Sequence, residues 1–89
     1  MISVLLPCHR EGHLLQRAID SVLAQTLPDW QLVLVCNNTD ETTLAVAQAA
    51  AQNDRRIFLV HEHTPGIAYA LNTGLKHCTD DYIARLDAD

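Results

Sequence analysis

The chain has 89 residues, 48% of them hydrophobic and 19% charged, with 3 Gly and 3 Pro; these values exclude a disordered or fibrous chain and allow one small domain with a marginal core. The formal charge of -5, with its Lys and Arg residues scattered, argues against a nucleic-acid partner and against a basic face for a membrane surface. No stretch is apolar over the roughly 20 residues that a membrane span needs.

The N-terminus and the cysteines indicate a cellular location. "MISVLL" lacks the basic region and cleavage site of a signal peptide. The three cysteines Cys8, Cys36 and Cys78 have no paired spacing, which favours reduced thiols. We therefore expect a cytoplasmic protein, and peripheral attachment to a membrane would use parts outside these residues.

The first half of the chain predicts two buried strands around a helix. "ISVLLP" (residues 2–7) is a continuous apolar run closed by Pro7, as in a central strand. Residues 11–25 carry apolar side chains at spacings of three and four, which predicts an amphipathic helix. "WQLVLVC" (residues 30–36) is rich in β-branched and aliphatic residues and predicts the second strand.

The second half repeats this alternation. "NNTDETT" supplies a turn and a cap, Thr39 or Asp40, for an alanine-rich helix that runs to about Gln52. After a third strand, "RIFLVHE", residues 64–78 predict a helix with Thr64 near its cap and Pro65 in its first turn. "DYIARLDAD" predicts the fourth strand.

Strands that alternate with helices of this length predict βαβ units, and hence a mostly parallel sheet with helices on both faces. In such sheets ligands bind beyond the carboxyl ends of the strands. Those ends carry "PCHRE", "CNNTD", "HEHTPG" and "DAD".

Asp87 and Asp89 are two residues apart at the end of the fourth predicted strand, so we expect them on one face, with Arg85 on the opposite face. Two close carboxylates favour a cation, and their oxygens suit Mg²⁺ or Mn²⁺. For an isolated Asp-X-Asp, a solvated strand end is the commoner outcome. No glycine-rich phosphate loop follows the first strand, however, so a metal is the simplest way to neutralise a bound diphosphate.

Two long segments together resemble a known family. "ISVLLPCHREGHLLQRAIDSVLAQTLPDWQLVLVCNNTDETT" and "HEHTPGIAYALNTGLKHCTDDYIARLDAD" are similar to the N-terminal, nucleotide-sugar-binding half of family 2 glycosyltransferases. The resemblance covers essentially the whole chain. It implies a GT-A-like, Rossmann-like three-layer α/β sandwich, truncated here after the Asp-X-Asp strand, with residues 1–89 forming one domain of a longer enzyme.

The resemblance also implies the site residues, and the chain departs from the family pattern at some of them. The base and ribose of a nucleotide diphosphate sugar, most commonly a UDP-sugar, would be held by two loops, while Asp87 would meet ribose and diphosphate and would hold the metal with Asp89. The loop residues are Pro7, His9 and Glu11 after the first strand and Cys36, Asn37 and Asn38 at the end of the second. Tyr is more common in the family at the position of His9, an acidic residue at that of Cys36 or Asn37, and Arg at that of Leu71. In this chain either Asn37 or Asn38 could accept a hydrogen bond from the base.

The implied activity is sugar transfer from the nucleotide diphosphate to an acceptor glycan or glycolipid, in polysaccharide or glycolipid synthesis. The family's catalytic base lies beyond the Asp-X-Asp, so we expect the isolated 89 residues to transfer little sugar. A non-catalytic nucleotide-binding module and a small interaction module are the alternatives. An open sheet of this size also leaves an exposed edge, so we expect the isolated chain to self-associate.

Two further patterns leave alternatives open. Cys8, His9, Cys36, His61 and His63 could be drawn as a zinc cluster, but none has zinc-ligand spacing, and buried thiols and surface imidazoles are the commoner result. Glu11 could equally be a ligand-binding residue or an acidic residue favoured at a helix start.

Overall fold

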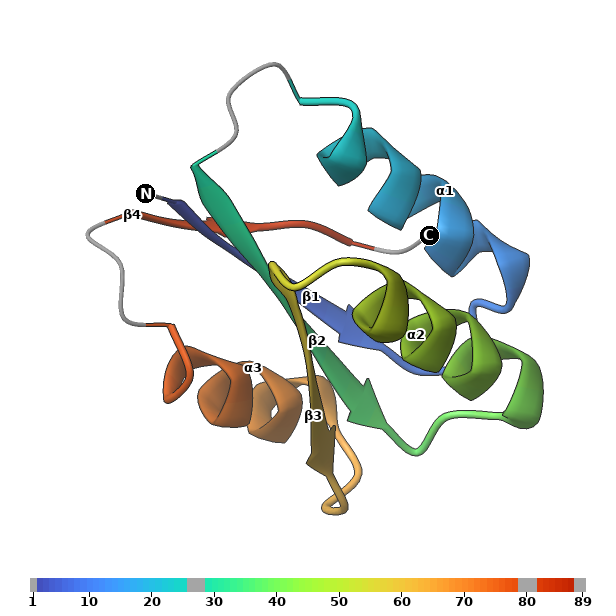
Figure 1. Cartoon of the computed structure of the whole chain (residues 1–89). Coiled ribbons are helices and arrows are strands. Elements are labelled where there is room, and N and C mark those ends of the chain that lie inside the picture. Colours follow the sequence, from blue (N-terminus) through green and yellow to red (C-terminus); the bar gives the residue numbers. More distant parts are fainter. Residues whose placement is uncertain (1, 26–28, 79–81, 88–89) are drawn as a thin grey trace.

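The computed structural model describes residues 2–25, 29–78 and 82–87, and within them strands and helices alternate as predicted (Figure 1). The elements in chain order are β1 (Ile2–Cys8), α1 (His13–Leu23), β2 (Trp30–Asn37), α2 (Glu41–Asn53), β3 (Ile57–Glu62), α3 (Ile67–Leu75) and β4 (Tyr82–Arg85).

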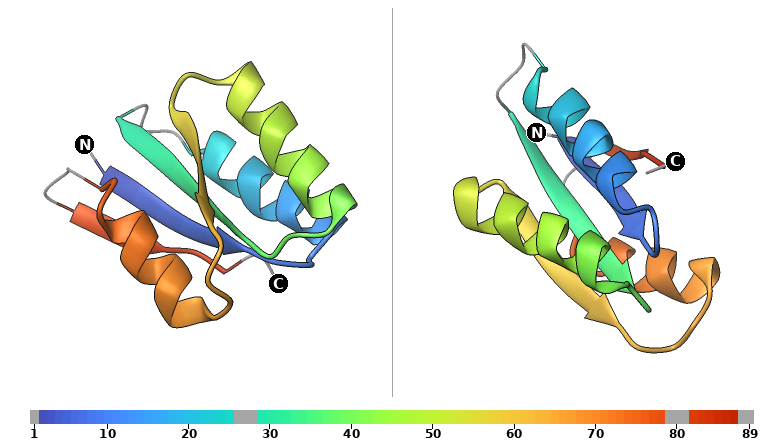
Figure 2. Two further views of the ribbon diagram at one scale, coloured as in Figure 1. Left: turned by 90° about the horizontal axis from the view of Figure 1, so that it is seen from below. Right: turned by 90° about the vertical axis from the view of Figure 1, so that its right-hand side faces the viewer.

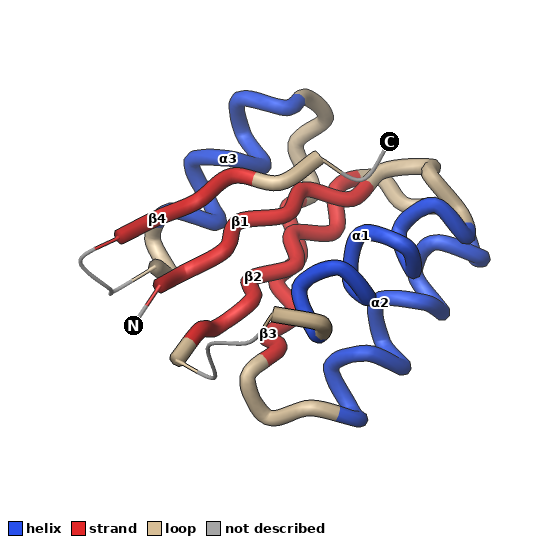
Figure 3. Tube along the Cα trace, turned by 90° about the horizontal axis from the view of Figure 1, so that it is seen from above, coloured by secondary structure: helices blue, strands red, loops and turns tan. Residues whose placement is uncertain are grey.

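The four described strands form one parallel sheet in the order β3-β2-β1-β4. In the view from above, α1 and α2 lie on one side of the sheet and α3 on the other (Figure 3). The predicted class is therefore confirmed: the chain is a three-layer α/β sandwich. The register places Cys8 beside Cys36 and Cys36 beside His61, so the carboxyl ends of β1, β2 and β3 meet at one edge. Figure 2 shows the loops that leave this edge.

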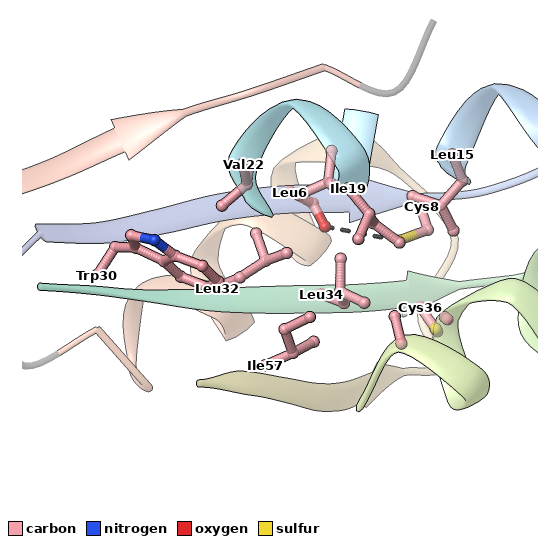
Figure 4. Close-up of a cluster of buried hydrophobic side chains, with 12 residues drawn as sticks. Leu6, Cys8, Leu15, Ile19, Val22, Trp30, Leu32, Leu34, Cys36 and Ile57 are labelled. Carbon is pink, nitrogen blue, oxygen red and sulfur yellow. Dashed lines mark hydrogen bonds between the residues drawn. The ribbon is translucent and has the colours of Figure 1, made fainter. Parts of the chain in front are cut away.

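Two apolar cores result from the alternation of side chains along the central strands. Leu32 and Leu34 on β2 face α1 and α2, whereas Val33 and Val35, which alternate with them, face α3. In Figure 4 the core side chains Trp30, Leu32, Leu34 and Cys36 follow one another along β2, and α1 contributes Leu15, Ile19 and Val22 to the same core. Leu32, Val33, Leu34 and Val35 are all fully buried. Because both faces of β2 are covered, its sequence is a continuous apolar run and does not alternate between apolar and polar residues.

The helix starts agree with the sequence at α2 and differ at α3. Asp40 is the cap of α2, and its side chain accepts a hydrogen bond of 2.9 Å from Thr43 N. We expected Thr64 near the cap of α3 and Pro65 in its first turn, but the helix begins at Ile67 with Gly66 as its cap, so both residues precede the helix. The reason is local, because the Thr64 N–H donates to the Glu62 carboxylate and so belongs to the turn before the helix.

The last strand is shorter than the expected 81–89. β4 ends at Arg85, although Leu86 N still donates a backbone hydrogen bond of 3.0 Å to Leu5 O on β1. All four β4 residues are exposed, and β4 is an edge strand of the sheet. Asp87 therefore lies beyond the strand. Within the part of the chain that the structure describes, no helix is long and apolar enough to cross a membrane.

Candidate functional site

The carboxyl edge of the sheet contains a hollow of about 470 Å³. The ends of β1 and β2, the start of α3 and the segment after β4 all contribute to it. The strands β1 and β4 are neighbours, but β1 leads to β2 through α1 on one face, whereas β4 is reached from β3 through α3 on the opposite face. Such a point, where the connections diverge, is where parallel α/β sheets bind ligands. The lining residues are Pro7, Cys8, His9, Glu11, Asn37, Asn38, Pro65, Gly66, Ile67, Ala70 and Asp87.

The loop after β1 is closed by its own carboxylate. Glu11 accepts hydrogen bonds from His9 N at 2.7 Å and from Arg10 N at 3.2 Å. The Gly12 N–H donates to the hydroxyl of Thr43 on α2 at 2.8 Å, which ties the loop to the second helix. The Glu11 carboxylate therefore closes the loop, a role that neither earlier interpretation included. Glu11 precedes the cap Gly12 and is not in the first turn of α1, and it borders the hollow.

The loop after β2 presents two asparagines in different ways. The Asn37 side chain is buried, with 6% of its surface exposed, and its amide bonds to the backbone of the β3–α3 loop. Asn38 is exposed and has a φ of 55°, a left-handed conformation that Asn tolerates better than most residues. Of the two asparagines, Asn38 is the one whose side chain makes no hydrogen bond within the described residues, and it borders the hollow.

Cys36 does not reach the hollow among the described residues. It is 3% exposed and packs in the core under α1 and α2, beside Cys8 of the neighbouring strand. Interaction with the Cys36 thiol and burial raise the pKa of Cys8, while interaction with the Cys8 thiol lowers the pKa of Cys36. Cys8, which was not among the expected nucleotide-binding residues, does border the hollow.

Asp87 borders the hollow from the segment after β4. Its side chain is 60% exposed and pairs with Arg85, with 3.3 Å between Arg85 Nη2 and Asp87 Oδ1. The expectation that these two side chains lie on opposite faces is wrong, because residues two apart in an extended segment share a side. Asp89 lies outside the described residues.

Asp87 offers one suitable metal ligand, but the described residues do not form a complete metal site. A solvent-accessible carboxylate is the oxygen donor that Mg²⁺ and Mn²⁺ prefer. Within residues 2–25, 29–78 and 82–87, no three His, Cys, Asp or Glu side chains are grouped to hold an ion. The zinc cluster is accordingly not assembled there. His61 and His63 instead stack on each other, with ring centroids 6.4 Å apart.

The start of α3 forms a wall of the hollow that the sequence did not assign to the site. Gly66, Ile67 and Ala70 line it, and Pro65 precedes them. The Pro65-Gly66 pair after the third predicted strand was the available signal. It marks a turn at a strand end, but nothing in its composition distinguishes a ligand-facing turn from an ordinary one.

Comparison with known proteins gives consistent results. The model of the family described as "Glycosyl transferase family 2" matches residues 3–89. Over its whole length the chain is 33% identical to the uncharacterized glycosyltransferase EpsJ of Bacillus subtilis (strain 168) and 37% identical to UDP-Glc:alpha-D-GlcNAc-diphosphoundecaprenol beta-1,3-glucosyltransferase WfgD of Escherichia coli. It covers 26% and 35% of these proteins, respectively, so it spans about a quarter to a third of their length.

Among solved structures, the mannosyltransferase PcManGT from Pyrobaculum calidifontis, in complex with GDP-Man and Mn²⁺, superposes with a TM-score of 0.88 at 28% identity. The superposition covers 99% of this chain and 27% of PcManGT. The fold is that of the GT-A glycosyltransferases, as the sequence resemblance implied.

Proposed function

This chain belongs to glycosyl transferase family 2, and on that premise we propose that it binds the nucleotide diphosphate sugar from which a glycosyltransferase takes its sugar. The observation that carries the proposal is the hollow at the carboxyl ends of β1 and β2, which has Asp87 at its border. GDP-Man in the PcManGT complex and UDP-Glc in the name of the E. coli relative support a nucleotide sugar as the ligand class.

In this proposal the two loops hold the nucleoside. Pro7 at the end of β1 and His9 and Glu11 in the loop after it form one side, and Asn37 at the end of β2 and Asn38 after it form the other. The exposed Asn38 amide is the group best placed to hydrogen-bond a base, since the Asn37 amide is occupied by backbone groups. Cys36 supports this wall from the core side.

Asp87 and Asp89 would hold Mg²⁺ or Mn²⁺ near the diphosphate. Bound there, the metal would neutralise the charge of the diphosphate as it leaves the sugar. Mn²⁺ in the PcManGT complex supports this choice of ion. The Arg85 guanidinium, 3.3 Å from Asp87, already offsets part of the carboxylate charge and would have to release it to the metal.

We further propose that residues 1–89 are one donor-binding domain of a longer enzyme that builds a polysaccharide or a glycolipid. The greater length of the relatives supports this division. The catalytic base would belong to the acceptor-binding part, so the isolated domain would bind nucleotide but transfer little sugar. A sugar-transfer assay of the 89-residue chain with a glycan acceptor tests this, and robust transfer would contradict it.

Calorimetry with UDP and with GDP, each with and without MnCl₂, tests the binding proposal. We expect heat of binding that depends on Mn²⁺ and that weakens at least about tenfold in Asp87→Asn, because a charged metal ligand is lost. Asp20→Asn is the matched control, since it removes the same charge from the exposed face of α1. If the wild-type chain binds neither nucleotide at millimolar concentration, the proposed function is wrong.

A further inference from the structure

We propose that Asn37 is a positioning residue, which sets the two walls of the hollow at the spacing a nucleotide requires. The inference rests on the proposed function. It assigns Asn37 a role different from reading the base: the side chain ties the end of β2 to the β3–α3 loop, and the backbone ties it to the loop after β1.

The Asn37 side chain uses both ends of its amide on backbone groups. Its Nδ2 donates to Thr64 O at 2.8 Å and to Glu62 O at 3.3 Å, and its Oδ1 accepts from Gly66 N at 3.4 Å. An amide has two donor hydrogens and one acceptor oxygen, so these three bonds engage all of its polar groups. Asn37 is 6% exposed, and its side chain could not turn toward a ligand without breaking these bonds.

The opposite wall is joined through the backbone of the same residue. His9 Nδ1 donates to Asn37 O at 2.8 Å, which connects the loop after β1 to the end of β2. His9 and Gly66 both line the hollow. One residue therefore contacts both walls, and any change in its bonding alters the distance between them.

The β3–α3 loop has a second attachment that would survive the loss of the Asn37 side chain. The Glu62 carboxylate accepts from Thr64 N at 3.0 Å and from the hydroxyl of Thr73 on α3. Helix α3 also packs on the sheet through the buried Ala70. A variant at position 37 should consequently keep the fold while the end of the loop at Gly66 shifts.

The decisive variant is Asn37→Asp, which keeps the shape of the side chain and removes its donors. Ionised, the new carboxylate faces the Thr64 and Glu62 carbonyl oxygens without a proton to offer. Protonated, it can donate one hydrogen bond again. Those carbonyls and burial raise the pKa of an acid at this position, so the donor returns as the pH falls.

We expect Asn37→Asp to bind UDP or GDP with Mn²⁺ about tenfold more weakly than wild type at pH 8, and to recover part of that loss at pH 5.5. The titratable groups around the position are His9 and Glu11 of the loop after β1, Glu62 of β3, and Asp87. Because the wild type carries all of them, the ratio of variant to wild-type affinity isolates the new carboxyl group.

Asn72→Asp is the matched control, since it makes the same chemical change at an exposed position on α3. We expect its affinity ratio to stay near one at both pH values. Circular dichroism of each variant reports whether the fold is kept. An Asn37→Asp ratio near one, or a loss that does not change with pH, overturns the positioning role.

A second measurement uses the wild type alone. In hydrogen exchange followed by NMR, the side-chain amide of Asn37 should exchange at least about tenfold more slowly than that of the exposed Asn72, because it donates to two carbonyls. Equal exchange rates overturn the inference even if Asn37→Asp does not fold. Wild-type chain that binds no nucleotide instead defeats the proposed function, so the two failures are distinguishable.

Discussion

Replacing Gly74 by Ala should destabilise the fold even though Ala is the better helix former. Gly74 lies buried on α3 where the helix crosses β1 and β2. A Cβ built there would approach Leu5 Cδ1 to 2.2 Å and Val35 Cγ2 to 2.8 Å, both below the 3.0 Å that real Cβ atoms respect. Leu5 is 3% exposed and Val35 is 0% exposed, so neither neighbour has free space to move into.

The expected loss follows from two opposed contributions. Ala in place of Gly inside a helix stabilises by about 1 kcal/mol. Overpacking a tight core costs about 1–3 kcal/mol, and two contacts below van der Waals distance place this site at or above the upper limit. We expect a net loss of about 2 kcal/mol in the free energy of unfolding, which lowers the midpoint of thermal unfolding by roughly 10 °C for a domain of this size.

Urea and thermal unfolding followed by circular dichroism measure this loss. Asn72→Ala is the control on the same helix, and it should be neutral or slightly stabilising because position 72 is exposed. Adding Val35→Ala should reduce the cost of Gly74→Ala, since the double variant removes one of the two clashes. If Gly74→Ala is as stable as wild type, α3 does not pack on the sheet at the described distance.

Three further predictions concern the loops and the edge of the sheet. Thr43→Val removes the buried hydroxyl that accepts a hydrogen bond from Gly12 N, and it should lower the free energy of unfolding in urea by about 1 kcal/mol. Thr42→Val, at an exposed position, is the control, and an equal loss in both variants would contradict the role of that bond. The hydroxyl of Thr73 and the amide of residue 64 lower the pKa of Glu62, so this carboxylate stabilises the fold above its ordinary pKa of 4.5 and ceases to do so as the pH falls through the lowered value. NMR titration of Thr73→Val should show the pKa of Glu62 moving back up, and an unchanged pKa would refute the assignment. In sedimentation experiments the wild-type chain should self-associate, and the Ile83→Lys variant, which places a charge on the exposed edge strand, should self-associate less. A wild-type chain that stays monomeric at high concentration would contradict a contact through this edge.

The alternation of strands and helices could be predicted because its signals are local. The continuous apolar run of β2 and the spacing of three and four residues in α1 can each be recognised within one short stretch of sequence. The cap of α2 at Asp40 is likewise a local choice, since a side-chain oxygen meets a backbone N–H three residues on.

The site was predictable in part, because the ends of parallel strands meet wherever the sheet forms. Pro7, His9, Glu11, Asn38 and Asp87 do border one hollow. Cys36 does not, because it continues the inward-facing row of Leu32 and Leu34. Whether Cys36 faces the core or the ligand depends on which face of β2 packs against the helices, and the motif "CNN" does not reveal this.

The sequence by itself therefore determined the element order, the parallel class and the edge of the sheet at which to look for a ligand, since each of these depends on residues close together in the chain. Only the tertiary structure decided what individual side chains do at that edge. The Asn37 amide meets backbone groups 25 to 29 residues away, and Gly74 is required by side chains on β1 and β2. Such contacts exist only after the strands have paired, because hydrogen bonding and close packing depend on distances in space rather than on spacing along the chain.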